Sequence, residues 1–201
     1  EMFDHAQEQL YGMLSVAGGK WTTSRKLGED VVRHLLAKEE LSGFALREAD
    51  TSRAALYGSP GFATSASSYA DFAVNEFSIL EVPEDVHRHL VTMYGTEHTE
   101  ILELVKKDKA LSKRLSKSRG RLDILAQVVY AVQNESALTL CDILSRRLAL
   151  GTFGLPEPAA VKAAANKAAE ILKWTPKRKK QEIWDLRASY PDAQALLKAA
   201  R

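Results

Sequence analysis

The sequence predicts a mainly α-helical protein that begins with one short strand–turn–helix unit. Residues 11–16 are almost all apolar and precede the pair Gly18 and Gly19, a pattern typical of a short strand that ends in a tight turn. From Pro83 onward, apolar residues recur at helical spacing, without the alternation typical of strands. These observations together predict a small α/β piece followed by an all-α bundle of about five to seven helices.

The composition sets limits on the class of protein. A length of 201 residues allows one medium-sized domain or two small ones, and a hydrophobic content of 45% is that of an ordinary globular protein. The formal net charge of +2 argues against a nucleic-acid-binding protein. The single cysteine, Cys141, excludes an internal disulfide and fits a reducing compartment. No apolar run approaches the roughly 18 residues that a transmembrane helix needs.

The first unit is predicted in three parts. Residues 10–17 form a strand covered on both faces, residues 18–23 form the turn, and residues 25–38 form a helix. Thr22 or Thr23 is the expected N-cap of this helix. The N-terminus of a helix presents free N–H groups, so the turn is a place for an anion or a carbonyl dipole.

The rest of the chain is predicted to be a linker followed by helices. Serine, glycine and proline are frequent between about residues 40 and 80, where a short helix from Ser68 to Phe77 is the main regular element. Residues 123–135 are apolar on nearly all sides, so this helix is expected at the centre of the bundle. Pro191 begins a last short helix or a frayed tail. The other predicted helices span residues 84–94, 97–107, 110–116, 139–150, 158–172 and 176–190.

Three segments resemble one known family. The segment Gly18-Gly19-Lys20-Trp21-Thr22-Thr23-Ser24-Arg25 resembles the C-terminal flavin-contacting segment of FAD-dependent glycerol-3-phosphate dehydrogenases of the aerobic, quinone-linked type. It departs from the family pattern at Ser24, where tyrosine is usual. Residues 128–147 and 174–183 are similar to the helical C-terminal domain of the same family.

The resemblance implies a domain organisation. Residues 1–40 are expected to be the last strand and helix of an FAD-binding α/β domain, residues 41–82 a linker, and residues 83–201 a helical C-terminal domain. The glycine-rich dinucleotide fingerprint does not occur in the sequence. We therefore expect the chain to be the C-terminal part of a longer enzyme and to be inactive alone.

The resemblance also implies a binding site. Backbone N–H groups and hydroxyls of Gly18, Gly19, Lys20, Trp21, Thr22 and Thr23 would contact the FAD ring. Lys20 is the expected catalytic residue, because a cation beside the ring would stabilise the negative charge of reduced flavin. The alternative is an exposed lysine after a turn. The Trp21 side chain is expected to be core, and Arg25 either pairs with another domain or lies in solvent.

The activity implied by the resemblance is oxidation of sn-glycerol 3-phosphate to dihydroxyacetone phosphate, with electrons passed to a quinone. An oxidase that uses oxygen and a non-catalytic helical interaction module are the alternatives. The family also implies peripheral association with the inner membrane on its cytoplasmic side, or a mitochondrial location in a eukaryote, and allows a homodimer.

Other polar residues favour structural interpretations. Glu135, Asp142, Arg146 and Arg147 are expected to form ion pairs between helix ends. His87, His89 and His98 are expected to be solvated, so no metal site is predicted. The basic run 177–180 is expected to be a solvated helix face, with contact to anionic lipid head groups as the alternative.

Overall fold

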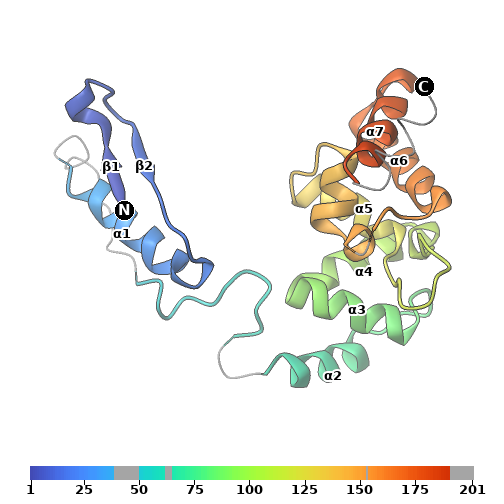
Figure 1. Ribbon diagram of the computed structural model, residues 1–201. Coiled ribbons are helices and arrows are strands. Elements are labelled where there is room, and N and C mark those ends of the chain that lie inside the picture. The colour runs from blue at the N-terminus through green and yellow to red at the C-terminus, as the bar shows by residue number, and fades with distance from the viewer. Residues whose placement is uncertain (39–49, 62–64, 153, 191–201) are drawn as a thin grey trace. The chain divides into compact units, whose positions relative to one another are not determined.

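A computed structural model describes residues 1–38, 50–61, 65–152 and 154–190. The chain divides into two compact units, Glu1–Leu56 and Tyr57–Arg201. Among the described residues the regular elements are seven α-helices, several 3₁₀ turns, one π-helical turn and one two-stranded sheet (Figure 1). The predicted mainly α class is confirmed.

The first unit is a hairpin with one helix. Strand β1 (Met2–Asp4) pairs antiparallel with β2 (Leu14–Val16), so that Phe3 lies opposite Ser15. Helix α1 (Ser24–Leu36) follows a 3₁₀ turn, Trp21–Thr23. The Asp4 carboxylate accepts from His34 Nε2 at 3.3 Å and pairs with Lys38 Nζ at 2.7 Å. Lys38, the Ala6 N–H group and His34 lower the pKa of Asp4 to about 2, so the C-terminal end of α1 is tied to the hairpin.

The predicted strand over residues 10–17 is wrong in length and in burial. Residues 10–13 belong to the hairpin turn, where Gly12 has φ +78° and Met13 N donates to Leu10 O at 3.3 Å. Tyr11 is 79% exposed, and Val16 in β2 is exposed as well. None of the described residues of the first unit is buried. The apolar side chains of this hairpin therefore have no core of their own within the described part of the unit.

The second unit is a helical bundle arranged around one helix. Every residue from Ala126 to Val132 in α5 (Leu125–Asn134) is buried, which confirms the predicted central position. One apolar cluster joins α5 to α3 (Glu84–Tyr94) and α4 (His98–Lys107). A second joins α5 to α6 (Pro158–Leu172) and α7 (Pro176–Ala188). Helices α3 and α6 have the predicted bounds.

Helix α2 (Ala66–Glu76) lies inside the stretch expected as a linker. Its N-cap is Ser65, whose Oγ accepts from Ser68 N at 3.1 Å, so the helix begins before the predicted Ser68. Ala73 and Val74 are buried against the rest of the unit.

Residues 57–61 lie against the corner between α3 and α4. Gly58 O accepts from Thr96 N at 2.9 Å, and a Cβ atom on Gly95, which has φ +55°, would lie 1.7 Å from Gly58 O. Only glycine permits this approach of two backbones. Tyr57 OH also donates to Glu97 Oε2 at 2.5 Å. The division between the units therefore falls directly before a segment that is fixed to the bundle.

Two predicted helices take other forms. The first turn of residues 139–150 has the predicted capping box, in which Asp142 N donates to Thr139 Oγ1 at 3.1 Å and Thr139 N donates to Asp142 Oδ2 at 2.9 Å. The segment Asp142–Arg147 then forms a π-helical turn that ends where Leu148 N donates to Ile143 O. A Cβ atom on Gly151 would lie 2.4 Å from Leu144 O, so this chain reversal is too tight for a continuing α-helix. Residues 110–116 contain only the 3₁₀ turn Lys109–Ser112. The predicted element after Pro191 lies outside the described residues.

The histidine prediction is wrong for His87 and His98, which are buried. Their ring centroids are 5.1 Å apart, and the rings of Tyr69 and Phe77 stand edge-on to His98. His98 Nδ1 donates to Gly95 O at 2.8 Å, whereas neither Nε2 atom has a hydrogen-bond partner among the described residues. Burial, with a contribution from His98, lowers the pKa of His87 to about 4, and burial lowers the pKa of His98. The helical periodicity of α3 and α4 places both imidazole rings on the sides of the helices that face the core. There the rings pack against other side chains although they are polar.

The bundle should fold without the first unit, and α2 should add to its stability. A chain of residues 57–190 should unfold cooperatively and be more stable than residues 83–190 by at least about 2 kcal/mol, since the shorter chain loses the burial of Ala73 and Val74 and the contact at Gly58. Urea unfolding followed by circular dichroism measures both. Equal stabilities would show that α2 is not part of the folded bundle.

Acid should destabilise the bundle through the histidine pair. The folded-state pKa of His87 lies below its ordinary value of 6.5, so its contribution to stability is complete above pH 6.5 and falls as the pH drops toward 4. Between pH 7.5 and pH 5 the free energy of unfolding should fall by about 2 kcal/mol from this group. The His87→Phe variant should lose that part of the pH dependence, whereas His5→Phe in the first unit should keep it. An unchanged slope in His87→Phe would contradict the assignment.

Candidate functional site

The turn between β2 and α1 forms a pocket. Its volume is about 320 Å³. It is lined by Val16, Gly18, Gly19, Lys20, Trp21, Ser24 and Leu27. All seven residues come from one continuous stretch of the first unit. The pocket therefore does not depend on any other part of the chain.

The structure brings together part of the predicted binding segment. Gly18, Gly19, Lys20 and Trp21 line the pocket, whereas Thr22 and Thr23 do not. Thr23 is the N-cap position of α1, but its side chain makes no capping bond and its Oγ1 donates to Lys20 O at 3.0 Å. The predicted N-cap position is therefore confirmed at Thr23, but the Thr23 side chain closes the turn instead of capping the helix.

The two glycines of the turn serve different purposes, and neither is required by an unusual backbone angle. Neither has positive φ. A Cβ atom on Gly18 would meet Leu27 Cδ2 at 3.0 Å, so Gly18 lets the turn lie close to α1. A Cβ atom on Gly19 would meet nothing within 4 Å. The absence of a side chain at Gly19 leaves open space at the pocket wall, where a flat ligand can lie against the backbone.

Lys20 contributes the positive charge of the pocket wall. Its ammonium group makes no ion pair with any residue of the described ranges. The first turn of α1 contains no acidic residue, so the positive end of the helix is not neutralised there. This combination favours an anionic or electron-rich ligand.

Trp21 is 93% exposed, which contradicts the prediction that its side chain is core. The first unit has no buried residue in its described part, so it contains no core there into which the indole can pack. Its position at the pocket leaves a large apolar ring free for contact with a ligand or another polypeptide.

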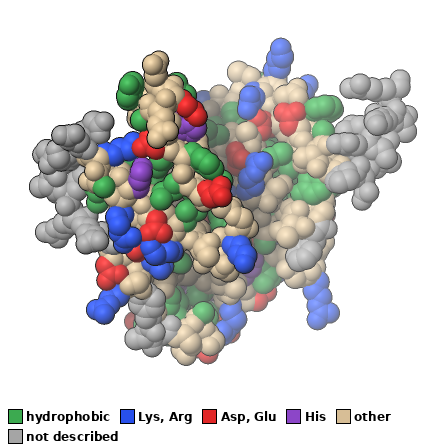
Figure 2. Space-filling view, turned by 60° about the vertical axis from the view of Figure 1, so that its left-hand side comes forward, with side chains coloured by type: hydrophobic (Ala, Val, Ile, Leu, Met, Phe, Trp, Pro, Cys, Tyr) green, Lys and Arg blue, Asp and Glu red, His purple; other side chains and the backbone are tan. Residues whose placement is uncertain are grey.

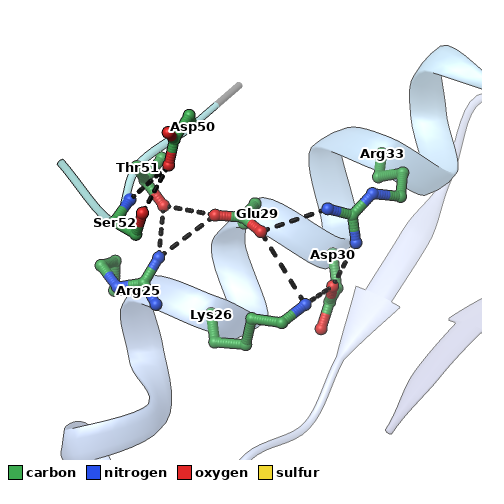
Figure 3. Close-up of polar contacts among 8 residues, drawn as sticks. All are labelled: Arg25, Lys26, Glu29, Asp30, Arg33, Asp50, Thr51 and Ser52. Atoms are coloured by element: carbon green, nitrogen blue, oxygen red, sulfur yellow. Dashed lines mark hydrogen bonds and ion pairs between the residues drawn. The ribbon is translucent and has the colours of Figure 1, made fainter. Parts of the chain in front are cut away.

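A network of ion pairs fixes the helix that carries the pocket (Figure 3). Arg25 Nη1 donates to Glu29 Oε2 at 3.1 Å and to Thr51 Oγ1 at 2.6 Å, and Thr51 Oγ1 donates to Glu29 at 2.7 Å. Lys26 and Arg33 also pair with Glu29 or Asp30. The Thr51 hydroxyl, followed by Arg33 and Lys26, lowers the pKa of Glu29. Arg25 thus has partners within its own unit, and residues 50–52 are held against α1.

Three further residues, Val16, Ser24 and Leu27, also line the pocket. Ser24 was noted only as a departure from the family pattern, and Val16 and Leu27 were predicted only as parts of the strand and the helix. The available signal was spacing, because Ser24 and Leu27 lie one turn apart on α1 and face the end of β2.

The other polar candidates have structural contacts. Asp142 pairs with Arg146 Nη1 at 2.5 Å, but this contact lies within one helical turn and not between helix ends as predicted. Glu135 Oε2 is buried without a hydrogen-bond partner in the described part of the chain. Burial raises the pKa of Glu135, and Arg147 opposes that rise. The described residues contain no cluster of three or more His, Cys, Asp or Glu that could hold a metal ion. Acidic and basic side chains are interspersed on the face shown in Figure 2.

A comparison with protein families decides the classification. The model of the C-terminal domain of alpha-glycerophosphate oxidase matches residues 49–179, more than half of the chain. The chain belongs to this family. The predicted resemblance is confirmed at that level, although residues 18–25 lie outside the matched region.

Curated relatives are named glycerol-3-phosphate dehydrogenases. A probable mitochondrial one from Dictyostelium discoideum is 30% identical over 173 residues, which are 86% of this chain and 25% of that protein. One from Synechocystis is 34% identical over 149 residues, 74% of this chain and 25% of that protein. A mitochondrial one from Arabidopsis thaliana is 28% identical over 189 residues, 88% of this chain and 29% of that protein. The chain thus spans about a quarter of the length of these relatives.

In the part of the chain that the structure describes, no helix combines the length and the apolar character needed to cross a membrane.

Proposed function

We propose that this chain is the C-terminal part of an FAD-dependent enzyme that oxidises sn-glycerol 3-phosphate to dihydroxyacetone phosphate. The observation that carries the proposal is the pocket at Gly18–Leu27 within a chain of this family. Relatives named glycerol-3-phosphate dehydrogenase, of which the chain matches about a quarter, support the same activity. The domain boundaries in this proposal are residues 1–40 for the end of the FAD-binding domain and 83–201 for the main part of the helical domain, with residues 41–82 as a connection whose helix α2 packs on the helical domain.

The residues of the pocket fit the edge of a flavin ring. Gly19 leaves the backbone open to a flat ligand, and Lys20 supplies an unpaired cation within the described part of the chain. In this proposal Gly18, Gly19, Lys20 and Trp21 hold the ring. Thr22 and Thr23 lie in the 3₁₀ turn behind it. When bound, FAD supplies the capacity to accept a hydride from the substrate.

Lys20 would act electrostatically. Reduction of a flavin places negative charge near one edge of the ring, and a cation held at the pocket wall lowers the energy of that charge. Among the described residues, Lys20 is the one cationic residue that lines the pocket, and the neighbouring Arg25 and Lys26 are paired with Glu29 and Asp30. The exposed apolar surface of the hairpin is, in this proposal, covered by the preceding part of the FAD-binding domain.

Two electron acceptors are compatible with the family. Relatives named dehydrogenases favour a quinone, which would place the enzyme at the periphery of the inner membrane, on its cytoplasmic side or in a mitochondrion. The family description names an oxidase, which favours oxygen. Peroxide formation during turnover by the full-length protein separates the two. A homodimer is compatible with either acceptor. The alternative function, a non-catalytic helical module, predicts that the full-length protein binds no flavin.

Lys20→Met should slow flavin reduction in the full-length enzyme without loss of flavin. The substitution keeps the length of the side chain and removes the charge, so the rate of reduction by glycerol 3-phosphate should fall roughly 30- to 1,000-fold, with a lower flavin reduction potential. Anaerobic stopped-flow absorbance measures the rate. Lys26→Met is the matched control, because Lys26 already pairs with Asp30. If the Lys20→Met variant keeps the wild-type rate of flavin reduction and the wild-type flavin potential, Lys20 has no catalytic role and is a surface residue.

A further inference from the structure

Helix α7 presents two different sides. Leu186 and Glu182 are buried on the side that packs on the bundle. Lys177, Lys180, Trp184 and Arg187 recur at spacings of three and four residues, so they share the opposite side of the helix. We call these four residues the outer row. All four are exposed, and Trp184 is 46% exposed although it is the largest side-chain type.

The acidic residues of α7 do not neutralise the outer row. Glu182 Oε2 accepts from Leu140 N at 2.8 Å, and Glu182 Oε1 pairs with Arg178 Nη2 at 2.5 Å. Asp185 Oδ1 accepts from Gln181 Nε2 at 2.8 Å. The side chains of Lys177, Lys180 and Arg187 make no hydrogen bond or ion pair with any residue in the described ranges.

Several surface cations on other helices of the same unit have acidic partners, whereas the exposed Lys107 in α4 and Lys162 in α6 have none in the described ranges. Arg88 pairs with Asp71 at 2.7 Å, Lys106 with Glu103 at 2.5 Å, and Lys167 with Glu170 at 2.9 Å. The outer row differs from these single positions because three unpaired cations share one side of a helix with an exposed indole. A row of this kind favours a partner that carries negative charge and also offers a partly apolar environment for an aromatic ring.

We propose that the outer row binds the surface of an anionic phospholipid bilayer. Its four residues extend over ten helical rises, from Lys177 to Arg187, or about 15 Å along one line. A helix surface is convex, so a planar bilayer can contact the whole row, whereas an acidic peptide needs a groove to hold it. Tryptophan prefers the head-group level of a bilayer, and lysine and arginine beside it are attracted to anionic lipid.

The inference deepens the proposed function and rests on its quinone branch, because a membrane quinone is dissolved in a bilayer. It assigns the contact with the lipid surface to α7. The expected binding is weak and electrostatic, so it should fall steeply with salt.

Co-sedimentation with vesicles tests the assignment on the 201-residue chain. Vesicles of phosphatidylcholine with about one-third phosphatidylglycerol should bind the chain at low salt, and pure phosphatidylcholine should not. The Lys177→Glu/Lys180→Glu variant should bind at least about tenfold more weakly, since each cation near an anionic surface contributes about fivefold. Trp184→Ala should weaken binding without a change in its salt dependence.

The matched control reverses the same number of charges elsewhere. Lys106→Glu/Lys167→Glu alters cations that already have acidic partners and should retain most of the vesicle binding. Circular dichroism of each variant checks the fold, and Lys177→Gln/Lys180→Gln provides a milder pair with the same expected direction. Absence of vesicle binding, or equal loss in control and test variants, would overturn the inference. Binding to poly-glutamate but not to vesicles would also overturn it and point to an acidic protein.

A separate measurement distinguishes failure of this inference from failure of the proposed function. Reduction of flavin by glycerol 3-phosphate in detergent, with full-length protein, does not require a membrane. If the α7 variants lose vesicle binding, the inference is supported, and the flavin result decides the activity independently.

Discussion

The burial of α5 on every side is the constraint on which the helical unit depends. The residues from Ala126 to Val132 have no solvent-facing position, so α5 must be covered by other helices on all sides. Two apolar clusters provide this cover, one from α3 and α4 and one from α6 and α7. The tight backbone contact at Gly58 and Gly95 and the π-helical turn before Gly151 follow from fitting the connecting segments closely around this centre. The hydrophobic effect thus determines the architecture of this unit.

The first unit is organised differently. It has no buried residue in its described part and is held by ion pairs around Asp4 and Glu29. Exposed ion pairs add little stability, so this unit needs further apolar contacts. A unit of this kind suits a site at the edge of a larger domain. In such a site, the open space at Gly19 is available to a ligand. Lys20, which has no ion pair within the described residues, is available to it as well.

Much of the helical unit was predictable because its periodicity is strong and its caps are local. Pro83 and Gly95 mark the ends of α3, and Glu157 and Pro158 mark the start of α6. The capping box at Thr139 was also visible in the sequence, because it involves only residues three apart. The burial of His87 and His98 was not predictable from polarity, since it results from packing between α2, α3 and α4.

The candidate site was predictable only in part. Gly18 to Trp21 could be singled out through their resemblance to a family, but the composition alone gives no reason to place a flavin there. The length of β2 depends on its pairing with β1, and the exposure of Trp21 depends on which parts of the polypeptide cover it. The positions of Ser24 and Leu27 in the pocket are local and follow from helical spacing. An apolar sequence pattern shows that residues tend to be buried. It does not show whether the residues that cover them belong to the same part of the chain.

The central claim is that the backbone at Gly19 lies against a flavin ring in the full-length protein. Gly19 and Gly28 both have open space where a Cβ atom would point, but only Gly19 lines the pocket. The flavin content of purified full-length Gly19→Leu and Gly28→Leu variants, measured by absorbance, therefore tests the claim directly. We expect Gly19→Leu to lose most of its flavin and Gly28→Leu to retain it. Full flavin content and a wild-type rate of reduction in Gly19→Leu would contradict the account.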